Sequence, residues 1–319
     1  MVMQTVQSVA PASTDNYTSS GVYVKPAHLI HTANEPLHWK ASTRLRQMLA
    51  RDEIVVAPGV CDGISARCAL EAGFTCLYQR VGAATTAAKL GQPDLAIATL
   101  PDFVQNASVI TNLSYSTPLI ADADTGFGGP AMVAHQVQTK RCGHLLGKQV
   151  VSTEEFLTRI RAAVQARDAI PGCDIVIIAR TDSAQVLGMD EAIRRLQAAA
   201  AVGADVAFIE GVKTKELLEK TVAALTPTPV LVNVISGGLT PSFTTKEAEQ
   251  MGAKIIIFSL VSAVAAVHAI REAMYLLKKT GTDHTSARGM DPRAFFEVVG
   301  LDEVIEVDRR AGGTALSSI

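Results

Sequence analysis

Seven short apolar runs alternate with amphipathic helical patterns from about residue 43 onward, and this alternation constrains the fold most. The runs cover residues 54–60, 74–79, 118–124, 174–182, 204–211, 229–235 and 254–259. They are nearly continuous in valine, isoleucine and alanine, which is typical of parallel strands covered on both faces. Parallel strands that alternate with helices predict an α/β fold, either a (β/α) barrel or an open doubly wound sheet.

The helical patterns carry start signals of their own. Ser152 with Glu155, and Thr244 with Glu247, have the spacing of a capping box. Further helical patterns cover residues 65–73, 95–113, 156–166, 189–203, 215–225, 244–252, 262–281 and 291–300. No GxGxxG motif opens a helix after the first run, which weighs against a dinucleotide-binding sheet and favours a barrel. A closed barrel of this type needs eight strands, whereas the sequence shows seven.

Composition excludes several classes of protein. The chain is 48% apolar with a formal net charge of −2, and its lysines and arginines form no basic stripe, so we expect no nucleic-acid partner. No apolar run reaches the roughly 18 residues that span a membrane, so we expect no membrane partner. The N-terminus lacks the pattern of a secretory signal. We interpret residues 1–42 as a disordered or extended arm, 43–282 as the barrel, and 283–319 as a helical segment and tail.

Five cysteines without CxxC spacing predict neither a disulfide framework nor a structural zinc site, and they fit a reducing, cytoplasmic compartment. Four of them lie in or beside apolar segments and are interpreted as core or near-core thiols. Cys142 differs, because it lies in the polar stretch QTKRCGHLLGK between Lys140, Arg141 and His144. These neighbours would stabilise a thiolate, and the adjacent glycines would let the loop move as a lid. The alternative is an exposed loop thiol with incidental neighbours.

The carboxyl ends of the strands are where barrel enzymes carry their function. The polar residues at these ends include Tyr78, Asp122, Asp124, Arg180, Asp182, Glu210, Asn233 and Ser259. Two aspartates two positions apart in a strand project to one side and repel each other unless a cation lies between them. Their hard oxygen ligands favour Mg²⁺ or Mn²⁺, although a local turn also explains the pattern. The arginine needs an anion, which is either Glu210 or a substrate carboxylate.

These residues together resemble the isocitrate lyase/phosphoenolpyruvate mutase superfamily. The matching segments are LGQPDLA, DADTGFGGP (122–130), KRCGH (140–144) and ARTD (179–182), with Asn233 followed by TP at 240–241. The resemblance covers residues 43–313. It implies a (β/α)8 barrel that uses Mg²⁺ or Mn²⁺ to make or break a C–C or P–C bond in small anionic di- or tricarboxylates. It also implies C-terminal helices that swap between subunits, giving a homo-oligomer, either a dimer or a tetramer.

The resemblance also implies residue roles. Asp122 is expected to bind the metal, with Asp94 and Asp124 acting directly or through water. Cys142 is expected to be the general acid that protonates the enolate left after cleavage, supported by Lys140 and His144. The expected substrate-binding residues are Tyr78, Gly143, Arg180, Glu210, Asn233 and Ser259.

Ser259 points to one branch of the superfamily. Relatives that cleave methylisocitrate generally carry proline at this place, whereas the fungal oxaloacetate hydrolases resemble this chain in having serine. The implied reaction is hydrolysis of oxaloacetate to oxalate and acetate. The alternatives are a lyase acting on a methylisocitrate- or dimethylmalate-like acid, and a catalytically impaired paralogue that binds an anion or pairs with an active relative.

The chain departs from the superfamily pattern at three places. About twenty residues are absent between residues 134 and 135, where a helix, a strand and a metal-site glutamate are expected. This gap explains why the sequence shows no eighth strand, and it predicts a barrel that lacks one helix–strand unit. Arg80 and Val81 replace small residues after the second strand, and Ser236 stands in place of a glutamate.

Overall fold

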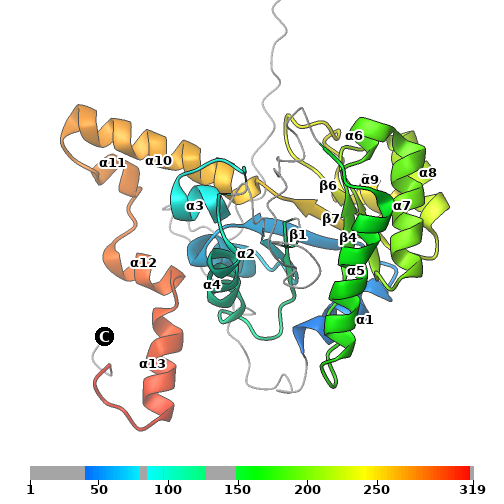
Figure 1. The fold of residues 1–319 in the computed structure, drawn as a ribbon. Helices are drawn as coiled ribbons and strands as arrows, with labels where there is room; N and C mark the ends of the chain where they lie inside the picture. Colours follow the sequence, from blue (N-terminus) through cyan, green and yellow to red (C-terminus); the bar gives the residue numbers. More distant parts are fainter. Residues whose placement is uncertain (1–39, 80–84, 96, 125, 127–148, 317–319) are drawn as a thin grey trace, which may run out of the picture. The chain divides into compact units, whose positions relative to one another are not determined.

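Seven parallel strands form the centre of the fold (Figure 1). The computed structural model describes residues 40–79, 85–95, 97–124, 126 and 149–316. The strands are β1 (Val55–Val60), β2 (Leu77–Gln79), β3 (Leu119–Ala121), β4 (Ile178–Thr181), β5 (Val206–Ile209), β6 (Val230–Asn233) and β7 (Ile255–Phe258). Each strand falls within one of the seven predicted runs, so that prediction is confirmed.

The order of the strands is β3-β2-β1-β7-β6-β5-β4, and every pairing between them is parallel. In the described part of the chain, β3 and β4 each pair on one side only. Between them in sequence, the described residues contain α5 (Thr153–Asp168) and no strand. The sheet is therefore a curled (β/α)8-type barrel that lacks one unit, as the sequence predicts.

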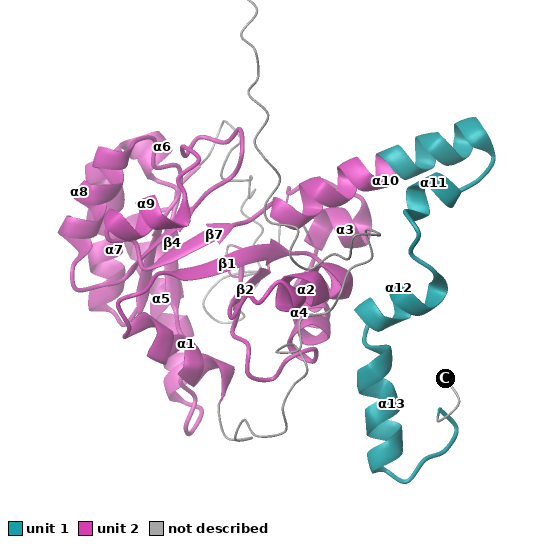
Figure 2. Cartoon of the chain, turned by 180° about the vertical axis from the view of Figure 1, so that it is seen from behind, with its two compact units in different colours: residues 1–35, 272–319 teal, residues 36–271 magenta. Residues whose placement is uncertain are grey.

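Helices cover the outer face of this sheet. In Figures 1 and 2, α2 (Gly63–Glu71) and α4 (Leu100–Thr111) lie beside β1 and β2, while α5, α7 (Met189–Ala201) and α8 (Lys215–Leu225) lie at the β4 end. The other helices that lie wholly beside this sheet in sequence are α1 (Ala41–Leu49), α3 (Thr86–Leu90), α6 (Ala184–Leu187) and α9 (Thr245–Gln250), and α10 (Val261–Thr280) follows β7. One apolar cluster fills the space between the strands and helices α7 to α9. A second cluster lines the inner face of the sheet, so the strands are apolar on both faces.

The seam between β1 and β7 brings two backbones unusually close. A Cβ atom added at Gly59 would lie 2.3 Å from the carbonyl oxygen of Ser259. The Ser262 hydroxyl also donates a hydrogen bond to the Gly59 carbonyl oxygen, at 2.6 Å. Glycine is therefore needed here because no side chain fits between the strand ends.

One predicted helix differs from the structure. A single helix was expected over residues 95–113, whereas α4 begins only at Leu100. The Asp102 carboxylate accepts a hydrogen bond from the Thr99 backbone N–H at 2.8 Å, and Pro101 occupies the first turn. Both features start a helix, so the preceding residues are excluded from it. The Thr244–Glu247 capping box is confirmed at the start of α9.

The chain divides into two compact units, residues 36–271 and residues 1–35 with 272–319 (Figure 2). The predicted boundaries at residues 42 and 282 stay predictions. The last helices are α10 (Val261–Thr280), α11 (His284–Ala287), α12 (Pro292–Val298) and α13 (Leu301–Arg310), and none of them has a buried residue. Among the described residues, no helix is both long and apolar enough to cross a membrane.

Candidate active site

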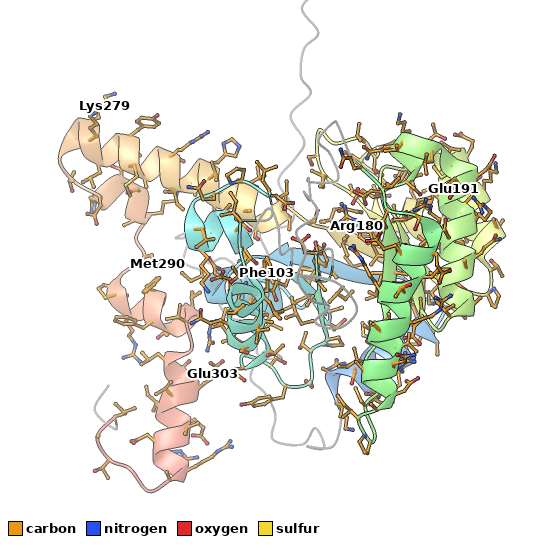
Figure 3. The ribbon with its side chains drawn as sticks, viewed as in Figure 1. Phe103, Arg180, Glu191, Lys279, Met290 and Glu303 are labelled. Atoms are coloured by element: carbon orange, nitrogen blue, oxygen red, sulfur yellow. The ribbon has the colours of Figure 1, made fainter. Side chains whose placement is uncertain are left out.

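Arg180 at the end of β4 is the centre of a charged cluster (labelled in Figure 3). Its Nε donates to Asp182 Oδ1 at 2.8 Å, and its Nη2 lies 3.0 Å from Glu210 Oε2. Burial opposes the charged form, but the carboxylates of Asp182, Glu210 and Asp122 outweigh it and raise the pKa of Arg180 well above its ordinary value. The sequence left Glu210 and a substrate carboxylate open as the partner of this arginine. The structure shows Glu210 in contact with it, while Nη1 makes no hydrogen bond to any described residue.

Asn233 and Ser259 extend this cluster across the neighbouring strands. Glu210 is 1% exposed, Asn233 4% and Ser259 1%. The Asn233 side-chain nitrogen lies 3.3 Å from Glu210 Oε2, and the Ser259 hydroxyl donates to Asn233 Oδ1 at 2.8 Å. Because β4, β5, β6 and β7 are adjacent in the sheet, their carboxyl ends place these four predicted residues in one network, of which all but Arg180 are buried.

A second group of predicted residues lies at the ends of β2 and β3. The Tyr78 hydroxyl donates to Asp122 Oδ2 at 3.3 Å, and the backbone N–H of Asp124 donates to Asp122 Oδ1 at 2.9 Å. Asp124 has a left-handed backbone with φ of 56°, which aspartate tolerates better than most residues. A turn is therefore present, but its side-chain acceptor is Asp122, whereas the sequence pointed to a bend that begins at Asp124. The electrostatic effect of Asp122 on Arg180 connects this group with the first.

Metal binding by the aspartates stays a prediction. Asp94 is buried in the segment between α3 and α4, and Asp122 and Asp124 are half-buried. The described residues contain no group of three histidine, cysteine, aspartate or glutamate side chains arranged to hold a metal ion. The donors themselves suit Mg²⁺ or Mn²⁺, because all of them are hard oxygens. The three carboxylates around Arg180 also exceed its single positive charge, and a cation would balance them.

The predicted catalytic loop lies outside the described residues. This applies to Lys140, Cys142, Gly143 and His144. The four described cysteines are free thiols. Cys61 and Cys76 are buried, as the sequence indicates, and burial raises the pKa of Cys76 to about 12. Cys68 is exposed on α2, so its interpretation as a core or near-core thiol is wrong.

Phe208 is a site residue that the sequence analysis missed. It lies directly opposite Arg180 in the β4–β5 register, and the guanidinium carbon of Arg180 is 4.9 Å from the centre of the Phe208 ring. The ring is 4% exposed and belongs to the inner apolar cluster. Sequence reasoning had no means of finding it, because an aromatic residue in a buried run looks like any other core residue until the register is known.

A parallel barrel with carboxylates, an arginine and an asparagine at its strand ends defines an enzyme of the class that acts on small anionic substrates. The phosphoenolpyruvate phosphomutase family model matches residues 45–278. The chain belongs to this family, within the isocitrate lyase/phosphoenolpyruvate mutase superfamily. It is an enzyme that cleaves a C–C bond in small carboxylic acids.

The similar proteins include both hydrolases and lyases. The chain is 34% identical to 2,3-dimethylmalate lyase of Eubacterium barkeri, over 84% of this chain and 96% of that protein. The structure of oxaloacetate acetylhydrolase in complex with the inhibitor 3,3-difluorooxalacetate is 48% identical and covers 86% of this chain and 98% of its own, with a TM-score of 0.82. A structure of 2,3-dimethylmalate lyase is 49% identical and covers 86% and 97%, with a TM-score of 0.81. Overall identity therefore does not separate the two activities.

A more distant structure contains a metal. It is a phosphonopyruvate hydrolase in complex with oxalate and Mg²⁺, 25% identical to this chain, with a TM-score of 0.71 and coverage of 85% and 99%. Superfamily members thus include a divalent-metal enzyme with oxalate in its structure.

Proposed function

We propose that this chain catalyses the divalent-metal-dependent hydrolysis of oxaloacetate to oxalate and acetate. The observation that carries the proposal is the Ser259 hydroxyl, which is buried at the end of β7 and bonded to Asn233. A hydroxyl group can hydrogen-bond the hydrated ketone of oxaloacetate, whereas a proline side chain cannot. The similarity to oxaloacetate acetylhydrolase supports the same activity.

The side chains of the site would share the work of binding and proton transfer. Arg180, through its Nη1, and Asn233 would hold substrate carboxylates, while Tyr78 and Gly143 would line the pocket. One hydroxyl proton of the hydrated ketone would pass to solvent, the C2–C3 bond would break, and the electron pair of that bond would form the enolate of acetate. Cys142 would then give its thiol proton to that carbon, yielding acetate and oxalate. Lys140 and His144 would support the cysteine.

Asp122 would hold the metal ion, together with Asp94 and Asp124 directly or through water. When bound, Mg²⁺ or Mn²⁺ would polarise the C1 carboxylate and the oxygen at C2 of the substrate. Asp122 would be oriented by the Tyr78 hydroxyl and by the backbone N–H of Asp124, both of which donate to its carboxylate. The same cation would offset the excess of carboxylates and admit an anionic substrate.

A lyase that acts on a 2-hydroxy acid is the second candidate. The 49% identity to the 2,3-dimethylmalate lyase structure favours it. The two reactions differ in their substrates and products, so a substrate comparison separates them.

The test is release of oxalate from oxaloacetate by the purified full chain, with Mn²⁺ and with EDTA. Metal-dependent release of oxalate is expected. 2,3-Dimethylmalate and methylisocitrate serve as matched substrates in the same buffer, and circular dichroism checks that the protein is folded. If the folded protein cleaves 2,3-dimethylmalate or methylisocitrate but releases no oxalate from oxaloacetate, the enzyme is a lyase instead. No turnover of any substrate by folded protein would point to an impaired catalyst that lacks its eighth unit.

We also propose that the chain works as a homo-oligomer in the cytoplasm. Helices α10, α12 and α13 present exposed apolar residues, including Val264, Val267, Met274, Phe295 and Val304. Such faces are stabilised when another surface covers them. Exchange of these helices between subunits would provide the cover. The free described cysteines fit a reducing compartment.

A further inference from the structure

A buried chain of hydrogen bonds runs across four adjacent strands, and each of its bonds has a direction. Arg180 on β4 contacts Glu210 after β5, Glu210 contacts Asn233 on β6, and Asn233 contacts Ser259 after β7. The last three side chains are all less than 5% exposed. Burial limits access of water to these groups, so each of them needs hydrogen-bond partners within the protein.

The direction follows from what each group can donate. A carboxylate paired with a guanidinium has only acceptor oxygens, so Asn233 must turn its NH₂ group toward Glu210. The distances from Asn233 Nδ2 to the two Glu210 oxygens are 3.4 and 3.3 Å. The Asn233 carbonyl oxygen then faces Ser259, and the serine must donate its one proton to it, at 2.8 Å. Any further hydrogen-bond partner of the Ser259 oxygen must therefore be a donor.

We propose that Glu210 is a positioning residue that fixes Ser259 as a hydrogen-bond acceptor toward the substrate. The site would then select a substrate that presents an O–H group at C2, such as a hydrated 2-oxo acid. It would disfavour the free ketone and oxalate, whose oxygens at that place are acceptors only. The inference rests on the proposed function, because it assumes that Ser259 faces C2 of the bound acid.

Glu210→Gln should reverse the direction of the chain. Arg180 would hold the amide oxygen of the new side chain, and the amide nitrogen would face Asn233. Asn233 would then turn its oxygen to residue 210 and its NH₂ group to Ser259. The serine would accept that bond, and its proton would be released to donate to the ligand. The substitution keeps the size of the side chain and changes the hydrogen-bond direction that Ser259 offers.

The experiment measures binding of two ligands by calorimetry in the presence of Mg²⁺. One ligand is 3,3-difluorooxaloacetate, whose fluorine atoms favour the hydrated ketone, and the other is oxalate. Glu210→Gln should weaken binding of the hydrated ligand by roughly tenfold, since one good hydrogen bond becomes a clash of donors. Binding of oxalate should stay the same or tighten. Glu219→Gln, on the exposed side of α8, is the matched control and should leave both affinities unchanged.

Ser259→Ala keeps the inference testable if Glu210→Gln does not fold. This variant should lose the preference for the hydrated ligand while it retains oxalate binding. The inference is overturned if Glu210→Gln weakens both ligands equally, or if Ser259→Ala keeps the wild-type preference. A wild-type protein that binds oxalate but not the hydrated ligand would overturn the inference and leave a carboxylate site in place. If the wild type binds neither ligand, the proposed function is contradicted, and the inference falls with it.

Discussion

The guanidinium of Arg180 depends on the residues around it for its orientation. Asp182 and Glu210 contact its Nε and Nη2 edge, and Phe208 lies under its face. The two carboxylates hold the Nε and Nη2 edge of the guanidinium, and the Phe208 ring adds a contact on its face. An aromatic face attracts a cation and favours one plane. Phe208 therefore helps to keep Nη1 in place, and in the proposed function this is the atom that binds a substrate carboxylate.

Phe208→Leu should raise KM for the carboxylate substrate about three- to tenfold, with little change in kcat, because the ring face under Arg180 is lost. The substitution should also cost about 1 kcal/mol of stability, as a volume change in a packed core does. Steady-state kinetics and thermal unfolding measure the two effects separately.

Leu231→Val is the control for the loss of core packing. Leu231 is adjacent to Phe208 in the β5–β6 register and belongs to the same inner cluster. It should lose a similar amount of stability with an unchanged KM. An unchanged KM in Phe208→Leu would show that the carboxylates alone orient Arg180.

Sequence reasoning recovered those site residues whose chemistry shows in their own type and position. Arg180 at the end of an apolar run required an anion, and Glu210 was named as a candidate before the structure showed the contact. The contact between Asn233 and Ser259 was not predictable, since it depends on the register of β6 and β7. Phe208 was missed for the same reason.

Hydrogen bonds join helix α1 to the segment that precedes β4. The hydroxyls of Ser42 and Thr43 donate to the Asp174 carboxylate, and Arg46 Nε donates to the Asp174 backbone oxygen at 2.7 Å. Arg46 also pairs with Asp205 at 2.9 Å. Burial alone would raise the pKa of Asp174, but the two hydroxyl donors, together with the positive charge of Lys40, outweigh it and hold that pKa below its ordinary value.

The Asp174 contact should make stability depend on acid. A carboxyl group whose pKa is lowered by folding stabilises the native state above its unfolded pKa, and this contribution is lost as the pH falls through the folded pKa. Wild-type stability should therefore decline from about pH 4 downward. Asp174→Asn should be about 1 kcal/mol less stable at pH 7 and should lose less on acidification. Urea unfolding from pH 7 to pH 2 measures both.

Asp190→Asn is the control for general acid effects. Asp190 is exposed and pairs with Lys220 at 2.7 Å on the helical surface, so its substitution should leave the acid profile parallel to that of the wild type. An Asp174→Asn profile parallel to the wild type would mean that the contact adds nothing to stability.

The elements were more predictable than their ends. All seven strands lie inside predicted runs because strands covered on both faces leave a nearly continuous apolar signal. Helix α1 was not predicted, since its anchors Asp174 and Asp205 lie more than a hundred positions away in the chain. Helix α5 begins as predicted, with Ser152 accepting from the Glu155 N–H at 3.2 Å, while the Glu155 carboxylate pairs with Arg159.

The whole molecule carries apolar surface that its own described core does not use. Helices α10 to α13 have no buried residue. Their exposed apolar side chains include some that are between 43% and 67% exposed, namely Phe295, Phe296, Val304 and Val307. A single chain of 33.7 kDa would leave this surface in water.

The protein should sediment well above 33.7 kDa, as a dimer or a larger assembly. Phe295→Asp with Phe296→Asp should shift it toward a monomer and lower Tm, because two charges would enter the covered face. Analytical ultracentrifugation and thermal unfolding measure these changes. Glu219→Lys, a charge reversal on α8, should alter neither. A wild-type protein that sediments as a monomer at micromolar concentration would contradict the proposed assembly.

The pairing of β1 with β7 has a consequence for folding during synthesis on the ribosome. Every other pairing in the described sheet joins strands that are consecutive in sequence. Strand β1, by contrast, pairs with β7, and Val55 lies opposite Ile255. The nascent chain therefore carries β1 with an open edge through most of translation, and an open edge invites pairing with other chains. Closure also needs the bare backbone of Gly59, against which the Ser259 carbonyl must fit. The yield of folded protein in a cell should depend on how well chaperones prevent the open edge of β1 from pairing with other chains until β7 has been synthesised.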